Sequence, residues 1–406
     1  MNPLSEIISR EAAERGVLPF ARFMELALYC PVHGYYEAEK DNPGRHGDYY
    51  TSVGVGELFG QLLAFQFAEW LETLNSDKSR AGPQPRKGAW PPRGFTPSTL
   101  NLVEAGAHDG RLARDILAWL QLKRPKLFGQ IEYWVIEPSP RRQKWQKETL
   151  KKFAPRVRWF SDFQELVGRD SVEPPQLNGV IFSNELLDAL PVHRLGWDAQ
   201  NKKWFEWGVA VDGEKFVWAR CSDTLASRSG ERAGARGFDP SSIPARDLSE
   251  FHLPSSLLAV LPDGYTIETC TAAENWWREA AGVLGHGKLL TIDYGFADDE
   301  LFSPGRRHGT LRAYFRHHAS DDLLANVGEQ DLTAHVNFSA IQTVGESAGL
   351  KTESFLTQSQ FLTQILGKTL LGKTFGEWTS AQARQFQTLT HPEHLGRAFR
   401  VLVQSR

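Results

Sequence analysis

The chain has 406 residues, long enough to bury a large core in one elaborated domain or in two. Its 46 Lys and Arg nearly balance 49 Asp and Glu, and the formal charge of −3 argues against a global basic field for nucleic acid or an anionic membrane. Cys30, Cys221 and Cys270 form no CxxC pair, which argues against a disulfide framework or a zinc site and favours a reducing, cytoplasmic compartment. The sequence contains no apolar run of the ~18 residues that a membrane span needs.

Residues 1–75 are predicted to be an N-terminal helical segment. Apolar residues recur at helical spacing on both sides of Gly16, which indicates two short amphipathic helices. Acidic residues are mixed into this stretch, so we interpret it as folded protein and not as a targeting segment. An aromatic-rich loop that ends in GDYYTS (residues 47–52) follows, and then a helix from about Gly56 to Leu74.

The rest of the chain predicts an α/β fold with two excursions. Residues 76–97 are basic and rich in Pro and Gly, typical of a flexible linker, and residues 196–254 are predicted to be a β-rich insertion with a flexible loop and a hairpin turn at Asp212-Gly213. Strands and helices alternate over residues 98–195 and 255–406, which indicates a mainly parallel sheet with helices on both faces.

Several elements of this core can be placed after the insertion. Strands are expected at YTIETC (residues 265–270) and KLLTIDYGF (residues 288–296), and helices at about Ala272–Leu284 and Asn337–Ala348. Two long C-terminal strands, LKTESFLTQ and FRVLVQSR, favour an antiparallel pair that closes the sheet.

The stretch LVEAGAHDGRL (residues 102–112) predicts a strand, a glycine turn and the start of a helix. In a doubly wound sheet this turn offers backbone N–H groups to a ligand, and Gly106 and Gly110 fall at it. The stretch lacks the GxGxxG spacing of a dinucleotide site, because His108 and Arg111 stand where small residues are expected. A dinucleotide oxidoreductase is therefore the least favoured function.

Acids follow three successive predicted strands. Glu104 would repel a phosphate, but it suits the ammonium of an amino-acid cofactor such as S-adenosylmethionine. Glu137 can accept hydrogen bonds from ribose hydroxyls, and Asp162 from an adenine amine. Each acid alone is also a common solvated turn residue, so the prediction of S-adenosylmethionine rests on the three together.

Nine segments resemble the MidA-like class I methyltransferases, a family whose mitochondrial members are protein arginine methyltransferases that assist assembly of respiratory complex I. The segments run in the family's order from about Leu26 to Leu350, and they are LALYCPVHGYY, GDYYTS, ELFGQLL, VEAGAHDGRLARDIL, IEPSPRRQKWQKETL, NELLDALPVHR, TIDYGF, GTLRAYFRHH and DLTAHVNFSAI. The resemblance implies a Rossmann-like class I methyltransferase sheet.

The same resemblance implies site residues and marks two departures. Glu104, Gly106 and Gly110 match the cofactor loop and Glu137 the ribose-binding acid, while Asn184 and Glu185 match the motif at the mouth of the active site. Thr51 and Ser52 of GDYYTS are assigned to the cofactor as well. A glycine is usual where His108 stands, and the family's TSPE is Thr51, Ser52, Val53 and Gly54 here.

Carboxylates matter most if the methyl acceptor is arginine, whose guanidinium is a poor nucleophile until acids orient it and take its proton. Glu185, Asp188 and Asp48 are the candidates; Asp188 alternatively caps a helix that begins near Ala189 or Leu190.

Five further motif residues have two interpretations each. Asp331 and Thr333 cap the helix near Asn337 or serve the active site, and His335 is a structural histidine or an active-site residue. Asp293 and Tyr294 of DYGF line a substrate cleft or turn the chain.

The favoured function is an S-adenosylmethionine-dependent protein methyltransferase, possibly acting on arginine. The alternatives are a small-molecule methyltransferase and a cofactor-binding assembly factor with weakened catalysis, to which His108, Val53 and Gly54 would point. We expect a protein substrate, no nucleic acid, no membrane span and no metal; the acceptor and the oligomeric state stay open.

Overall fold

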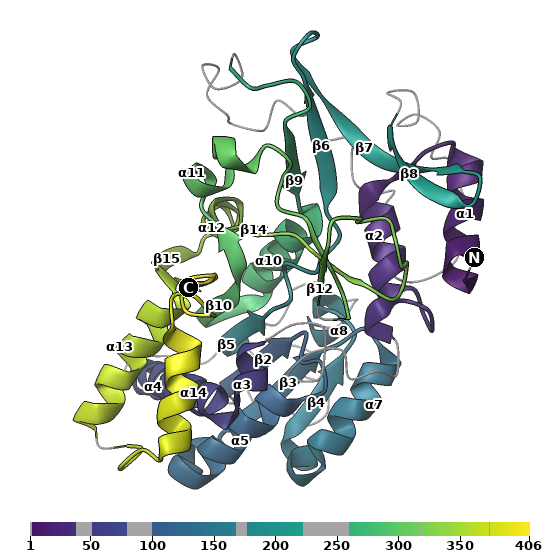
Figure 1. Cartoon of the computed structure of the whole chain (residues 1–406). Coiled ribbons are helices and arrows are strands. Elements are labelled where there is room, and N and C mark those ends of the chain that lie inside the picture. Colours follow the sequence, from purple (N-terminus) through teal and green to yellow (C-terminus); the bar gives the residue numbers. More distant parts are fainter. Residues whose placement is uncertain are drawn as a thin grey trace. The chain divides into compact units, whose positions relative to one another are not determined.

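The structure is a computed structural model that describes residues 2–37, 51–78, 100–167, 177–221, 260–316, 318–372 and 374–406. The chain divides into two compact units (Figure 1). The accessory unit comprises Met1–Lys40, Ala189–Ala272 and Asp298–His335, and the core unit comprises Asp41–Asp188, Ala273–Ala297 and Val336–Arg406.

The core unit is built on an eight-stranded sheet in the order β15-β16-β10-β5-β2-β3-β4, with β14 paired to β10. Its strands are β2 Leu100–Ala105, β3 Ile131–Ile136, β4 Val157–Phe160, β5 Leu177–Asn184, β10 Leu284–Phe296, β14 Val336–Asn337, β15 Lys351–Thr357 and β16 Phe399–Ser405. The neighbouring strands β4, β3, β2, β5 and β10 run parallel, whereas β16 is antiparallel to both β10 and β15. The expected antiparallel closure by the C-terminal strands is confirmed.

Helices cover both faces of this sheet, as predicted. All six residues of β2 are buried, which is typical of a parallel strand covered on both sides. On one face Leu102, Val180 and Leu290 share a hydrophobic cluster with residues of four helices. These helices are α4 Glu57–Lys78, α5 Arg111–Lys123, α13 Gln358–Leu371 and α14 Ser380–Thr390.

The opposite face carries α10 Thr271–Val283 and α12 Phe338–Ser347. The alternate strand side chains point to this side, because successive residues of a strand face opposite ways. Here the indole of Trp277 on α10 donates to Gln404 Oε1 on β16 at 2.8 Å, and Gly345 of α12 packs against the same glutamine. Both expected helices near Ala272 and Asn337 are therefore confirmed.

Two helices of the core unit, α13 and α14, are absent from the sequence-based prediction. Each begins with a capping box in which a threonine at the N-cap and a glutamine three residues on exchange hydrogen bonds, Thr357 with Gln360 and Thr379 with Gln382. These Thr-x-x-Gln pairs are the sequence signal that could have identified them. Both helices contact α4, beside which they lie in Figure 1.

Short helical segments complete the core unit. They are α3 Ser52–Val55, α6 Pro125–Phe128, α7 Pro140–Thr149, η2 Lys151–Arg156 and α8 Phe163–Val167. The α4 helix continues to Lys78, so residues 76–78 of the predicted linker are helical; the rest of it, from residue 79, lies outside the described residues.

The accessory unit contains the two predicted N-terminal helices, α1 Pro3–Arg15 and α2 Phe20–Tyr29, which separate at Gly16 with φ 78°. It also has a five-stranded sheet, β1-β7-β6-β9 with β8 paired to β7, and a three-stranded sheet, β12-β11-β13. The strands are β1 Leu18–Pro19, β6 His193–Asp198, β7 Lys203–Asp212, β8 Lys215–Arg220, β9 Thr266–Thr269, β11 Arg312–Phe315, β12 His318–Ser320 and β13 Asp331–Thr333.

Three local predictions are wrong for the accessory unit and the chain that follows it. The strand at YTIETC exists as β9, but it pairs antiparallel with β6 and does not join the parallel sheet. The β7–β8 hairpin turns at Gly213-Glu214, one residue later than predicted, since Asp212 already pairs with Lys215. Asp331 and Thr333 cap no helix because both belong to β13; the N-cap of α12 is Asn337, whose side chain accepts from the Ala340 N–H.

No helix among the described residues is long and apolar enough to cross a membrane.

Candidate active site

The carboxyl ends of β2, β3 and β5 lie at one edge of the core sheet, because these strands are parallel neighbours. The chain leaves β2 toward β3 on one side and later returns to β5 on the other, so the strand order reverses at β2. In open α/β sheets ligands bind outside such a reversal. Glu104, Glu137 and Asn184 stand at these three strand ends, as the sequence predicted.

Glu104 is a buried acid whose environment disfavours its charge. Its side chain is 2% exposed, and the Tyr133 hydroxyl donates to Oε2 at 2.6 Å. Burial raises the pKa of Glu104 to about 8; the Tyr133 hydrogen bond lowers it in part, and the charge of Asp109 raises it. A cation brought to this carboxyl would therefore restore its ionised form.

The loop after β2 depends on left-handed backbone. Gly106 has φ 73° and Gly110, the N-cap of α5, has φ 84°. His108 lies between them with φ 45°, a conformation that costs a non-glycine residue ~1 kcal/mol. His108 thus adopts a left-handed backbone that a glycine at this position would adopt without that cost.

Glu137 is fixed by the start of α7. It is 1% exposed; Oε1 accepts from the Ser139 N–H at 3.0 Å, and Oε2 accepts from Gln146 Nε2 at 3.0 Å. Arg142 Nε lies 3.2 Å from Oε1. These contacts fix the carboxylate at the start of α7, and its hydrogen bond to a ribose hydroxyl stays a prediction.

Asp162 behaves as a helix cap. Its Oδ1 accepts from the Glu165 N–H at 2.6 Å at the start of α8, beyond the edge strand β4. The structure thus explains this acid without a ligand, and its contact with an adenine amine stays a prediction.

Asn184 and Glu185 form the centre of the candidate site. Glu185 follows β5 with φ 52°, and its Oε1 accepts two hydrogen bonds at 3.0 Å, from Asn184 Nδ2 and from the backbone N–H of Ser52. Because the Asn184 amide donates to Glu185, its Oδ1 faces the other way, buried and without a hydrogen-bond partner among the described residues.

The charge of Glu185 is disfavoured as well. The residue is partly exposed, but its carboxyl group is surrounded by protein. Removal from water raises the pKa of Glu185 to about 8; the hydrogen bonds from Asn184 and Ser52 lower it in part, and the charge of Asp293 raises it.

The GDYYTS motif reaches the site through Ser52. Thr51 caps α3 by accepting the Gly54 N–H at 2.9 Å, and Ser52 donates its N–H to Glu185. The departures Val53 and Gly54 are therefore compatible with the helical turn that places Ser52. Asp48, the third acid proposed for catalysis, lies outside the described residues.

Asp293 organises the turn that carries the candidate acids. It is 0% exposed; Oδ2 accepts the N–H groups of Leu186 and Leu187, and Oδ1 accepts that of Tyr294. The predicted helix after Asp188 is absent, since residues 188–190 are turn and bend, and the N–H groups of Leu186 and Leu187 are bound by the Asp293 carboxylate. The sequence offered Asp293 as a cleft residue or a turn residue; the structure shows the second.

The strand ends together fit a ligand that is cationic and rich in hydroxyl groups. Glu104 and Glu185 lack a basic partner among the described side chains, and the orphaned Asn184 Oδ1 requires a donor. A pyrophosphate would meet carboxylates here. The described residues include no cluster of three or more His, Cys, Asp or Glu arranged to hold a metal ion.

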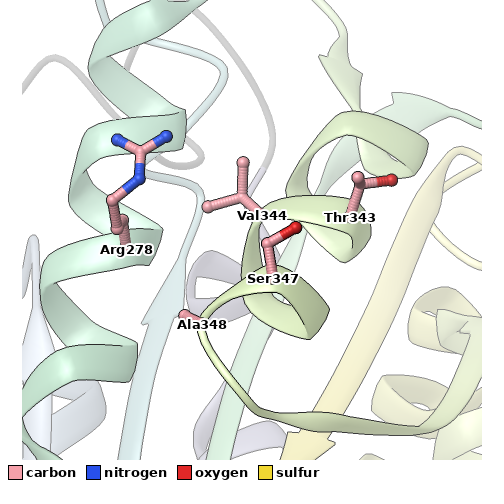
Figure 2. A pocket seen from close by; sticks show the side chains of 5 residues that line it. All are labelled: Arg278, Thr343, Val344, Ser347 and Ala348. Atoms are coloured by element: carbon pink, nitrogen blue, oxygen red, sulfur yellow. The ribbon is translucent and has the colours of Figure 1, made fainter.

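A separate hollow of about 190 Å³ lies between α10 and α12 (Figure 2). It is lined by Arg278, Thr343, Val344, Ser347 and Ala348. None of the residues predicted for the site contributes to it.

Known proteins resemble this chain over nearly its whole length. A family model described as S-adenosyl-L-methionine-dependent methyltransferase matches residues 63–356. The mitochondrial protein arginine methyltransferase NDUFAF7 of Homo sapiens and its homologue in Drosophila melanogaster are each 26% identical, over 98% of this chain and 82% and 84% of theirs.

A solved structure agrees with these matches. A Burkholderia thailandensis protein, crystallised with S-adenosyl-homocysteine, is 30% identical and superimposes with a TM-score of 0.74, covering 99% of this chain and 92% of that one. Its ligand agrees with the cofactor predicted from the acids at the strand ends.

Asp293→Asn should destabilise the core unit by about 2 kcal/mol, since the amide leaves a buried backbone N–H without an acceptor. Urea unfolding at pH 8 measures this, where the carboxyl is ionised. Asp162→Asn is the matched control, because asparagine caps a helix as well as aspartate does. Equal stability of Asp293→Asn and the parent would contradict the role of Asp293 in the turn.

Glu137→Ala should weaken S-adenosylmethionine binding by about 2 kcal/mol, the value typical of hydrogen bonds to a charged group. Glu137→Gln should lose less, because it keeps an acceptor. Calorimetry on the folded variants measures both, and parental affinity in the two would mean that Glu137 only fixes the start of α7.

Proposed function

Since this chain belongs to the MidA-like family of S-adenosyl-L-methionine-dependent methyltransferases, we propose that it methylates a nitrogen of a protein side chain, the guanidinium of arginine. The bound cofactor supplies an electrophilic methyl group. The residues at the end of β5 would then bind and orient the acceptor.

The proposal rests on which hydrogen-bond donors and acceptors of Asn184 and Glu185 are already used within the protein. The two described donors here, Asn184 Nδ2 and the Ser52 N–H, both point at Glu185 Oε1. Two acceptors remain: the buried Asn184 Oδ1 and, when Glu185 is ionised, its second oxygen, which has no hydrogen bond among the described residues. Two acceptors and a negative charge suit a ligand that brings several N–H groups and a positive charge.

A guanidinium gains from such a pair in two ways. Its charge is spread over three nitrogens, and a carboxylate beside it localises that charge and fixes the nitrogen that is to be methylated. The nitrogen must also lose a proton after transfer, and a carboxyl with a raised pKa is a better proton acceptor than an ordinary glutamate. We assign both tasks to Glu185, with Asp188 and Asp48 as further candidates.

The relatives support the same acceptor, because the NDUFAF7 proteins are named protein arginine methyltransferases. Their names also say mitochondrial, whereas the cysteine content of this chain favours the cytoplasm, so the cytoplasmic location stays our prediction. A small-molecule methyltransferase or an assembly factor with weakened catalysis would give different outcomes in the experiments that follow.

Glu185→Gln should leave cofactor affinity near the parental value and slow methyl transfer at least about a hundredfold, since it keeps the shape but removes the orienting charge. The assay transfers labelled methyl into protein from the lysate of a strain that lacks the gene. Glu132→Gln is the matched control, a glutamate near the amino end of β3 that pairs with Arg158, away from the carboxyl ends of the strands.

Each other outcome of this experiment points to a different account. Parental transfer by Glu185→Gln would contradict the guanidinium clamp, and loss of cofactor binding would assign Glu185 to the cofactor. Label in small molecules only would favour the small-molecule enzyme, and cofactor binding without any label would favour the assembly factor. If Asp48 shares the task, the double variant Asp48→Asn/Glu185→Gln should be slower than either single variant.

The rate should depend on pH with a defined sign. The pKa of Glu185 is raised to about 8, so its carboxyl is neutral below that pH and anionic above it. Arginine stays charged throughout, hence kcat/KM for the acceptor should rise tenfold per unit below pH 8 and level off above it. Initial rates from pH 6.5 to 9.5 test this; a rate that falls through pH 8 would contradict an anionic clamp.

A further inference from the structure

The α13–α14 hairpin touches the candidate site through one buried glutamine. Gln358 is the first residue of α13 and is 0% exposed. Its Nε2 donates to the Leu389 carbonyl of α14 at 2.9 Å, which fixes the orientation of the amide. The Oε1 atom consequently faces the Ser52 hydroxyl, which donates to it at 3.0 Å.

Ser52 links this glutamine to the candidate acid. The residue is 0% exposed, and both of its donors are used: the hydroxyl on Gln358 Oε1 and the backbone N–H on Glu185 Oε1. Rotation or displacement of Ser52 would therefore break its bond to Glu185. Without the Gln358 contact, Ser52 would keep its backbone N–H, but it would lose the buried hydrogen bond that fixes the orientation of that N–H toward Glu185.

A second glutamine shows that the hairpin supports the whole junction between α3 and α4. Gln385 of α14 accepts the Leu58 N–H with Oε1 at 3.1 Å, in the first turn of α4. Gly56 approaches the same amide so closely that a Cβ would lie 2.5 Å from its nitrogen. The hairpin thus holds the chain at Ser52 and again just after Gly56, which leaves the α3 turn little freedom to move.

We infer that Gln358 is a positioning residue for methyl transfer, which acts through Ser52 to hold the Glu185 carboxyl beside Asn184. The inference rests on the proposed function, since it assigns Gln358 a role only if Glu185 acts on the acceptor. Nothing in the inference requires Gln358 to touch substrate or cofactor. Its side chain is enclosed by α13, α14 and Ser52.

The first test needs no substrate. Hydrogen exchange of the protein without added cofactor, followed on peptides that span residues 49–60, reports protection of the Ser52 amide. Gln358→Met replaces the amide with an apolar side chain of similar size and should lower that protection. Gln404→Met is the matched control: Gln404 is equally buried and bonded to Trp277, Gln342 and Thr352, but it lies on the other face of the sheet.

The second test measures methyl transfer into lysate protein. Gln358→Met should slow transfer about tenfold, the effect of losing the hydrogen bond from the Ser52 N–H to the charged Glu185 carboxylate. It should also move the pH profile to higher pH by about half a unit or more. Cofactor affinity should be unchanged. Ser52→Ala keeps the N–H and removes only the hydroxyl, so it should reproduce these effects with the smallest change to folding. Gln404→Met should show neither the loss of rate nor the pH shift.

Double variants separate this inference from the proposed function. If Gln358 acts through Ser52 and Glu185, then Gln358→Met should cost nothing further in a Ser52→Ala or Glu185→Gln background. Full additivity, or unchanged Ser52 protection, would overturn the positioning role while leaving the clamp intact. Parental transfer by Glu185→Gln would instead overturn the clamp, and the role of Gln358 with it.

Discussion

A carboxyl group removed from water without a cation beside it resists ionisation, and the core sheet holds three such groups near its strand ends. Burial raises the pKa of Glu104 and Glu185 to about 8 and that of Asp293 to about 6. These buried carboxyl groups therefore favour the binding of cations at this edge of the sheet. A sulfonium cofactor and a guanidinium acceptor are both cations, and each would relieve part of this cost on binding.

The three acids differ in how the protein uses them. Asp293 is satisfied by backbone N–H groups and holds the turn after β5, which in turn sets the left-handed conformation of Glu185. Among the described residues, Glu104 accepts a side-chain hydrogen bond only from Tyr133. Glu185 is held on one oxygen by Asn184 and Ser52, leaving acceptors for a ligand. Asp293 of the sheet and Ser52, which the C-terminal hairpin holds, thus both help to fix the position of the Glu185 carboxyl.

Strand ends and glycine turns were predictable from the sequence because they depend on neighbours along the chain. Apolar runs that end at Glu104 and Asn184 mark strand ends, and Gly106 and Gly110 mark left-handed backbone. Contacts between distant segments were not predictable. Nothing in the sequence pairs Ser52 with Glu185 or Gln358 with Ser52, 133 and 306 residues apart. The strand β9 was misplaced for a similar reason: its apolar alternation suits an antiparallel sheet as well as a parallel one, and only pairing with β6 decides.

Identification of the methylated atom tests the central claim most directly. Protein from a gene-deleted strain is labelled with purified enzyme and methyl-labelled S-adenosylmethionine, hydrolysed, and its amino acids are separated. We expect label in methylated arginine, and at least about a hundredfold slower labelling when Glu185→Gln replaces the parent. Label that resides in a carboxyl ester, or in a carbon- or sulfur-methylated residue, would contradict this expectation, because Asn184 Oδ1 and the ionised Glu185 carboxylate are suited to a cationic nitrogen.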